Sequence, residues 1–329
     1  MPPQGHAVAR PPVADWFARR SYEHNRFRAL EPLARRKLEL GLKLSIVLPC
    51  REVAGTIGAI SDEIHALNEE APLVDQVVAI DAGSADGTAE VARRHGLEVY
   101  SEDELVPELG PALGKGDAMW RALSVVRGDL VMYLDSDTTN FGRHFVYGML
   151  GPILSRPEVR FVKATYHRPF LGPDGAVLDD AGRVTELTAK PLLRIFYPEL
   201  SGFGQPLSGE LVAHRALLAS IPFWTGYAVE TGMLIDVFRA GGLDAMGQVG
   251  LGARRNRSQS LRALGSMSYA VATAIVRRSL EDGRLVSSNG LAGELRSYVR
   301  AVCTPDGTTL EEEAIELLER PPIAEVVGD

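Results

Sequence analysis

Short apolar runs alternate with helical periodicity from Leu44 onward, which is the pattern of successive βαβ units and a mostly parallel sheet. The run LSIVLP at 44–49 predicts the first strand. The residues after it predict a helix, because its apolar positions recur at spacings of three and four: Ile57, Ile60, Ile64 and Leu67. Further strands are expected at 77–81, 97–100 and 129–135. A helix that Ser84 or Asp86 can cap and a helix at 115–126 complete three crossovers.

The second half of the chain has a different character. A strand is expected at 160–169, a glycine-rich loop or hairpin at 170–181, and helices at 183–196, 227–240 and about 260–280. Before the first strand, 15–40 predicts a helical arm. The predicted division is an N-terminal helical arm (1–43), an α/β half with the first four strands (44–140), a second half (141–280) and a C-terminal extension (281–329). The fold class is α/β, Rossmann-like, with a helical C-terminal part.

Composition excludes several classes of protein. The chain has 329 residues, 45% of them hydrophobic, so it can bury a full α/β core. Its 35 basic and 43 acidic residues give a net charge of −8, which argues against a general nucleic-acid or anionic-membrane surface. We expect no transmembrane segment and no secretory signal. Cys50 and Cys303 form neither a disulfide framework nor a zinc pattern, so a cytoplasmic location is expected.

Polar side chains follow three of the predicted strands, and ligands of open parallel sheets bind at these strand ends. The first end is Pro49-Cys50-Arg51, the second begins at Asp81 and includes Ser84, and the third is Asp135-Ser136-Asp137. Each has a structural alternative, since Asp, Ser and Gly are also common in turns and caps. Their shared position at the ends of one sheet favours a binding site.

Two of these segments suit a diphosphate. Asp135 and Asp137 flank one residue after a buried strand, so their carboxylates can bind a hard divalent cation that also binds phosphate. Lys115 lies between Gly114 and Gly116, where small residues allow a ligand to approach the backbone and the lysine to meet a phosphate oxygen. The alternative for Lys115 is an ordinary solvent-facing side chain.

The order LSIVLP, IDAGSADGT, GKGDAMW and YLDSD resembles the nucleotide-binding half of A-type glycosyltransferases. The later segments VKATYHRP, GRVTELTAKPLLRIFYPEL, QPLSGE and GYAVETGMLID resemble the actinobacterial glucosyl-3-phosphoglycerate and mannosyl-3-phosphoglycerate synthases. The resemblance covers about residues 44–280, and it implies that 44–140 are the nucleotide-sugar-binding half and 141–280 the acceptor-binding half. It implies a retaining transfer of a hexose from a nucleoside-diphosphate sugar, either GDP-mannose or GDP- or UDP-glucose, to the 2-hydroxyl of 3-phosphoglycerate. It also implies Mg²⁺ or Mn²⁺ as cofactor and a homodimer.

The resemblance also implies roles for individual residues. Donor-binding positions are Pro49, Cys50, Arg51, Asp81, Ser84, Lys115, Asp135 and Ser136. Acceptor-binding positions are Gly182, Arg183, Thr185 and Tyr227. Catalytic positions are Leu207, Glu230 and Asp137, and metal-binding positions are Asp135, Asp137 and Asn256. The acceptor-binding role also makes physical sense for Gly182, Arg183 and Thr185. They lie at a predicted helix start, where free amides and a neighbouring guanidinium can together bind an anion.

The chain departs from the family pattern at two positions. Relatives carry Asn-Glu-Glu after the first strand, whereas this chain has Arg51-Glu52-Val53, and Arg51 makes a guanine nucleotide the preferred donor. Asn256 stands where relatives have a metal-binding histidine, and its amide oxygen would be a harder ligand. Alternatively, the neighbouring Arg254, Arg255 and Arg257 could neutralise phosphate in place of a metal contact. Two alternatives remain open: a sugar nucleotidyltransferase, and a catalytically inactive nucleotide-sugar-binding protein.

Overall fold

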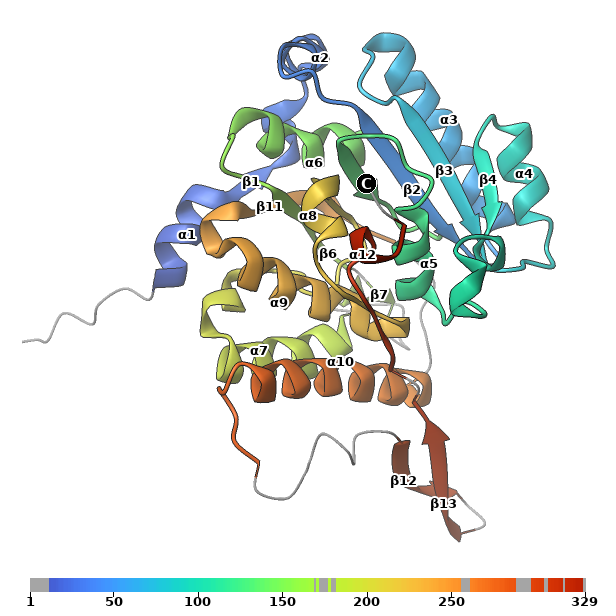
Figure 1. The fold of residues 1–329 in the computed structure, drawn as a ribbon, viewed down its shortest axis with the longest axis vertical. Helices are drawn as coiled ribbons and strands as arrows, with labels where there is room; N and C mark the ends of the chain where they lie inside the picture. Colours follow the sequence, from blue (N-terminus) through green and yellow to red (C-terminus); the bar gives the residue numbers. More distant parts are fainter. Residues whose placement is uncertain are drawn as a thin grey trace, which may run out of the picture.

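The computed structural model describes residues 12–168, 170–171, 177–178, 182–255, 261–287, 297–304, 307–315 and 317–327. Its centre is an eight-stranded sheet with the order β1-β11-β6-β9-β5-β2-β3-β4 (Figure 1). Only β9 runs antiparallel to its neighbours in that sheet, β5 and β6. The strands are β1 (Ser21–Glu23), β2 (Leu44–Cys50), β3 (Gln76–Asp81), β4 (Glu98–Ser101), β5 (Leu130–Tyr133), β6 (Phe161–His167), β9 (Leu211–His214) and β11 (Met246–Ala253). The predicted α/β fold with a mostly parallel sheet is confirmed.

Helices cover both faces of this sheet, and successive residues of β2 show how it is buried. Ile46 and Leu48 belong to one apolar cluster, while Val47 between them belongs to the other, because side chains alternate along a strand. Helices α2 (Leu30–Glu39), α3 (Ala54–Glu70), α4 (Thr88–Arg94) and α6 (His144–Ser155) lie on the first face. Helices α5 (Lys115–Ala122), α7 (Lys190–Phe196), α9 (Val229–Gly241) and α10 (Leu261–Glu281) lie on the second.

Most of the predicted elements are present. The four strands expected in the first half correspond to β2, β3, β4 and β5, and the strand expected at 160–169 is β6. The helical stretch expected at 183–196 contains a π-helical turn at Thr185–Ala189 followed by α7. Helix α5 ends at Ala122, four residues earlier than expected, and 123–125 continue as turns.

The N-terminal segment is not purely helical, which corrects the prediction of a helical arm. Helix α1 (Pro12–Arg20) and α2 flank β1, which pairs in parallel with β11 and becomes an edge strand of the central sheet. A three-residue strand has too few positions to show a periodicity, and only its neighbour β11 identifies it. The other predicted boundaries, at 140 and 280, remain predictions.

The C-terminal part returns to the body of the molecule. A hairpin of β12 (Ser297–Thr304) and β13 (Gly307–Ala314) projects away from the sheet (Figure 1). The chain then forms β14 (Glu319–Arg320), which pairs with β10 (Phe223–Trp224), and ends the described part with α12 (Ala324–Val327). In the region predicted as a loop or hairpin, β7 (Phe170–Leu171) pairs with β8 (Val177–Leu178). None of the described helices is both long and apolar enough to cross a membrane.

Candidate active site

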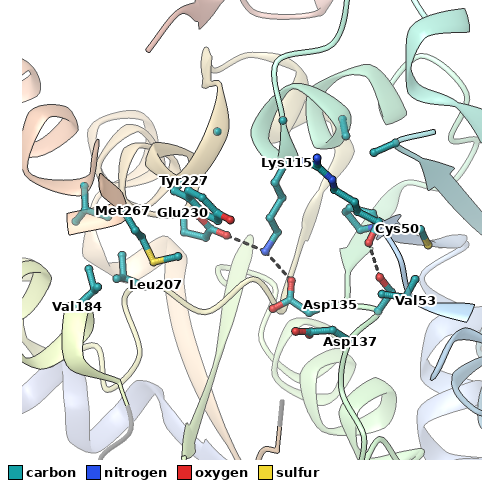
Figure 2. Close-up of a pocket in the computed structure, with 18 of the residues that line it drawn as sticks. Cys50, Val53, Lys115, Asp135, Asp137, Val184, Leu207, Tyr227, Glu230 and Met267 are labelled. Atoms are coloured by element: carbon teal, nitrogen blue, oxygen red, sulfur yellow. Dashed lines mark hydrogen bonds and ion pairs between the residues drawn. The ribbon is translucent and has the colours of Figure 1, made fainter. Parts of the chain in front are cut away.

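The carboxyl ends of β2, β3 and β5 open into a cavity of about 700 Å³, which also borders α5, α9 and α10. It collects side chains that are far apart in the sequence (Figure 2). The predicted residues that line it are Pro49, Cys50, Arg51, Lys115, Asp135, Ser136, Asp137, Gly182, Arg183, Thr185, Leu207, Tyr227 and Glu230. The structure therefore joins the two predicted halves at one site.

Asp81 and Ser84 do not line this cavity. The hydroxyl of Ser84 accepts a hydrogen bond from the backbone N–H of Glu52 at 3.0 Å, and the Asp81 carboxylate accepts one from the N–H of Ser84 at 3.1 Å. In this structure the two residues order the loop that follows β2. Their predicted contacts with the donor remain predictions. Asn256 lies outside the described residues.

Lys115, the first residue of α5, lies at the centre of the charged part of the cavity (Figure 2). Its Nζ is 2.6 Å from Asp135 Oδ1 and 2.8 Å from Glu230 Oε1. Burial alone would lower the pKa of Lys115, but the two carboxylates outweigh burial and raise it well above its usual range. Lys115 therefore carries a permanent charge between a strand end and a helix of the opposite half.

Two glycines near Lys115 have no room for a side chain. Gly116 was expected to let a ligand approach the backbone, but the structure gives it another role. A Cβ at Gly116 would lie 2.0 Å from the backbone oxygen of Trp224, so the glycine is needed for contact between α5 and β10 rather than for a ligand. A Cβ at Gly209 would lie 2.2 Å from Asp135 Oδ1 and 2.4 Å from Lys115 Nζ. Gly209 thus leaves room for the ion pair itself.

Arg254, one of the three arginines expected to be able to neutralise phosphate, is a buried cation of the site. Its Nη2 lies 2.9 Å from both Asp135 Oδ2 and Asp137 Oδ1, and its Nε lies 3.0 Å from Glu210 Oε1. Its Nη1 donates to the hydroxyl of Tyr166 at 3.0 Å. Burial would raise the pKa of Asp135, but Lys115 and Arg254 hold it well below its usual range. Asp135 is therefore ionised wherever the fold persists.

Two further ionisable residues, Glu210 and Lys163, interact electrostatically with Lys115 and Asp135 of the site, and the sequence analysis missed both. Glu210 is buried, and burial raises the pKa of its carboxyl despite the opposing effect of Arg254. Lys163 is fully buried on β6, and burial lowers the pKa of its amine to about 8. A lysine inside the apolar strand FVKATYH was the available signal, because a charged group in a buried strand needs a nearby counter-charge.

The donor set fits a hard divalent cation. Asp135 and Asp137 follow the end of β5 and face the cavity, and Mg²⁺ is commonly bound by one or two carboxylates together with substrate phosphates. Among the described residues, no cluster of three or more acidic, histidine or cysteine side chains is suited to a metal. The remaining ligands would therefore come from substrate, water or the predicted third position.

The opposite end of the cavity combines a helix start, a guanidinium group and an apolar wall. Gly182 and Thr185 are buried at the start of a helical stretch, where the N–H of Glu186 already bonds the Gly182 carbonyl at 2.8 Å. Arg183 adds a guanidinium to the same wall. Apolar side chains complete this end of the cavity: Val184, Leu207, Leu264, Met267 and Val271.

Carboxylates and a lysine at the strand ends of a mostly parallel sheet are the arrangement expected of a nucleotide-sugar transferase, and the known proteins that resemble the chain agree. Residues 45–170 match the family described as Glycosyl transferase family 2. A glucosyl-3-phosphoglycerate synthase from Petrotoga mobilis is 35% identical over 312 residues, which are 94% of this chain and 95% of the relative. The one from Mycobacterium tuberculosis is 39% identical over 289 residues, which are 86% of each chain.

Solved structures extend the comparison. The crystal structure of mannosyl-3-phosphoglycerate synthase from Rubrobacter xylanophilus is 58% identical, with a TM-score of 0.88, and the match covers 95% of this chain and 98% of that one. Glucosyl-3-phosphoglycerate synthase from Mycobacterium tuberculosis, in complex with Mn²⁺, UDP and glucosyl-3-phosphoglycerate, is 36% identical with a TM-score of 0.75 over 89% of this chain and 94% of that one. The chain belongs to the glucosyl- and mannosyl-3-phosphoglycerate synthase family of glycosyltransferases. This assignment favours a glycosyltransferase over the nucleotidyltransferase and the inactive binding protein.

Proposed function

We propose that this protein transfers a hexose from a nucleoside-diphosphate sugar to the 2-hydroxyl of 3-phosphoglycerate, with retention at the anomeric carbon. The product is mannosyl- or glucosyl-3-phosphoglycerate, a precursor for compatible-solute or polysaccharide synthesis. The observation that carries the proposal is the single cavity that joins the Asp135–Lys115–Glu230 cluster to the wall at Gly182–Thr185. Donor diphosphate and anionic acceptor would therefore meet at one place.

The relatives support both substrates. The mycobacterial enzyme is described in complex with UDP-glucose, phosphoglyceric acid and Mn²⁺, and the one from Rubrobacter is described as a mannosyl-3-phosphoglycerate synthase. The larger identity, 58%, is with the mannosyl enzyme. That ranking favours mannose as the sugar of this chain's donor.

At the donor end, Asp135 and Asp137 would hold Mg²⁺ or Mn²⁺, with Asn256 as the proposed third ligand. When bound, the metal would neutralise negative charge on the departing nucleoside diphosphate. Lys115 contributes a fixed positive charge beside the same phosphates, and Arg254 contributes a second. Pro49, Cys50 and Ser136 line the donor path; burial raises the pKa of the Cys50 thiol to about 12, so it is a packing residue and no nucleophile.

At the acceptor end, Arg183, with the amides near Gly182 and Thr185, would bind the phosphate and carboxylate of 3-phosphoglycerate. Tyr227 lies across the cavity and is 48% exposed, so its ring is available to a ligand. These positions would place the acceptor hydroxyl toward the centre of the cavity.

The chemistry needs no covalent carboxylate in this proposal. Glu230 is held by Lys115 at 2.8 Å, which suits a group that orients sugar hydroxyls better than a free nucleophile. The acceptor hydroxyl would attack on the face from which the nucleotide departs, and a leaving phosphate oxygen would accept its proton. Leu207 lines the same region and would help to exclude water.

The family resemblance also supports a cytoplasmic homodimer. Sedimentation velocity over a range of protein concentrations tests the assembly: a species of twice the mass of the 35.6 kDa chain is expected.

A donor panel tests the reaction. Purified protein is incubated with 3-phosphoglycerate, Mg²⁺ or Mn²⁺, and in turn GDP-mannose, GDP-glucose, UDP-glucose and ADP-glucose. Mass spectrometry identifies the product, and the anomeric coupling constant reports retention or inversion. The expected product carries the hexose on the 2-hydroxyl of 3-phosphoglycerate, with the same anomeric configuration as in the donor. Hydrolysis of every donor without transfer to 3-phosphoglycerate would refute the acceptor, and an inverted product would refute the retaining mechanism.

A further inference from the structure

Beyond the charged centre, the cavity extends along the ends of β2, β3 and β4. This end is lined by Arg51, Val53, Ile80, Ala82 and Glu102, together with Ala112. In the proposed function, the hexose must face the acceptor wall at Gly182–Thr185, and the diphosphate lies at Lys115 and Asp135. The nucleobase is therefore left with the Arg51–Glu102 end, on the far side of the diphosphate.

Glu102 is the acidic side chain of this end. It follows β4 directly, is partly buried and borders the cavity. Within the described part of the chain, its carboxylate forms no hydrogen bond or ion pair. Burial raises the pKa of Glu102 to about 7, and Asp103 and Asp117 add to the effect, while Arg121 and Arg51 oppose it. A desolvated carboxylate beside a ligand cavity is a candidate for recognising the ligand.

The loop that carries Glu102 is held in place from behind. The buried guanidinium of Arg121 donates to the backbone carbonyls of Glu102 and Gly110, at 3.4 and 2.6 Å, and also to that of Leu105. The Asp103 carboxylate accepts the backbone N–H of Ala112 at 2.8 Å, which closes the loop on itself. The carboxylate of Glu102 is therefore presented from a braced segment, so little ordering remains when a base binds.

The hydrogen-bonding groups of the nucleobases decide which base the side chains of Glu102 and Arg51 can recognise. Guanine carries two adjacent donors, N1–H and the 2-amino group, which can both bond one carboxylate, and its O6 and N7 accept from arginine. Uracil has a single N3–H between two carbonyl oxygens, which a carboxylate repels. Adenine presents an acceptor, N1, beside its amino group. A carboxylate with an arginine nearby therefore matches guanine alone among these three.

We infer that Glu102 is the residue that selects the nucleobase of the donor, by accepting hydrogen bonds from N1–H and the 2-amino group of guanine. The inference rests on the proposed function, since it needs a nucleoside-diphosphate sugar in this cavity. It makes Glu102, rather than Arg51 alone, the determinant of a GDP-sugar donor.

The test measures nucleotide binding rather than turnover. Isothermal titration calorimetry in the presence of Mg²⁺ compares the affinities for three nucleotides: GDP, UDP and inosine diphosphate. Inosine diphosphate differs from GDP only by the absence of the 2-amino group. The wild type is expected to bind GDP at least about tenfold more tightly than either, because each charge-assisted hydrogen bond contributes about a factor of ten. In Glu102→Ala, GDP and inosine diphosphate should bind equally. Glu102→Gln should weaken the binding of GDP about tenfold and change the affinity for UDP by less than about threefold.

Glu104→Gln is the matched control, because Glu104 is an exposed carboxylate two residues away that does not line the cavity. It should leave all three affinities unchanged. Wild-type protein that binds UDP as tightly as GDP overturns the inference, and so does a Glu102→Gln variant that loses GDP and UDP equally. Failure of all three nucleotides to bind would instead refute the donor site, and with it the proposed function.

Discussion

At the scale of single residues, the site is organised by cations that are shared between carboxylates. Lys115 bridges Asp135 and Glu230, and Arg254 bridges Asp135, Asp137 and Glu210. Sharing fixes the side chains relative to one another before any substrate arrives, which is the condition for electrostatic stabilisation without reorganisation. Removing one member leaves charges that the others compensate only in part.

Replacing Asp137 is expected to reduce turnover without unfolding the protein. In Asp137→Ala, Arg254 keeps its contacts with Asp135 and Glu210, so the fold should persist. Turnover should fall about a hundredfold or more, because a charged metal ligand is removed where the diphosphate departs. Initial rates at saturating substrate and a thermal melt measure the two effects. A folded variant with unchanged turnover would contradict the role of Asp137.

Glu102 gives a prediction for stability against pH. The pKa of Glu102 is about 7 in the folded chain, against an ordinary value of 4.5 for a glutamate, so the folded state keeps a proton that the unfolded state loses between these two pH values. Stability is therefore lost as pH rises through this window and stays reduced above it. The substitution Glu102→Gln removes the ionisable carboxyl and, with it, this loss of stability at high pH. The variant should be more stable than the wild type at pH 8, by on the order of 1 kcal/mol after solvent screening, and nearly equal at pH 4.5.

Urea unfolding at both pH values measures this difference. Neighbouring charges, Asp103, Asp117, Arg121 and Arg51, remain in both proteins, so the comparison isolates Glu102. A stability difference that is the same at pH 4.5 and pH 8 would show that the carboxyl does not titrate with the raised pKa.

At the scale of elements, the C-terminal segment braces the helix that begins with Lys115. The buried carboxylate of Asp117 on α5 pairs with Arg320 of β14 at 2.6 Å and with Arg121 at 3.3 Å. Trp120 on the same helix donates to the carbonyl of Pro321 at 2.8 Å. Because β14 also pairs with β10, just before Tyr227, one short segment stabilises two walls of the cavity.

Asp117→Ala should therefore destabilise the whole chain. It leaves two buried guanidinium groups without their shared carboxylate, and breaking a buried ion pair in this way costs about 3–5 kcal/mol. Chemical denaturation gives the free energy of unfolding. Glu108→Ala, which removes an exposed carboxylate from the neighbouring loop, is the control and should change stability by less than about 0.5 kcal/mol. Equal effects of the two substitutions would refute the bracing role.

Elements with a strong local pattern were predictable from the sequence, and those that depend on distant partners were not. β2, β3 and β5 have apolar runs that end in polar residues. The sequence therefore predicted both these strands and the positions of Arg51 and Asp135 at strand ends. By contrast, β1 exists because β11 lies beside it. The sequence offered Arg254 only as one of three arginines near phosphate. No local pattern encodes its contacts with Asp137 and Thr138, which lie more than a hundred positions away.

At the scale of the whole molecule, the cavity has a different charge balance from the rest of the chain. The net charge of the chain is −8, whereas the cavity is lined by five cationic side chains (Arg51, Lys115, Arg168, Arg183 and Arg254) and four carboxylates (Glu102, Asp135, Asp137 and Glu230). A concave site that is not net negative can concentrate anions locally even on an acidic protein. The anionic ligands expected here, a diphosphate and phosphoglycerate, would thus be drawn to one opening rather than to the general surface.

The same charge balance predicts that metal and nucleotide bind cooperatively. Asp135 and Asp137 are paired with cations of the chain, so a divalent ion alone must compete with Arg254 and Lys115 for the carboxylates. A nucleoside diphosphate offers phosphate oxygens both to the metal and to the released cations. Each ligand should therefore tighten binding of the other by the same factor, at least about tenfold.

Calorimetric titration of GDP with Mg²⁺ and with a chelator measures the factor from one side, and titration of Mg²⁺ with and without GDP measures it from the other. Thermal melts should show the full stabilisation only when both are present, since a ligand at a hundred times its Kd adds about 2.7 kcal/mol. Guanosine, which lacks phosphates, is the matched control and should bind with the same affinity whether or not metal is present. If GDP binds equally tightly in the chelator, the pairs that Arg254 and Lys115 form with the aspartates do not compete with a metal, and the two aspartates are not its ligands.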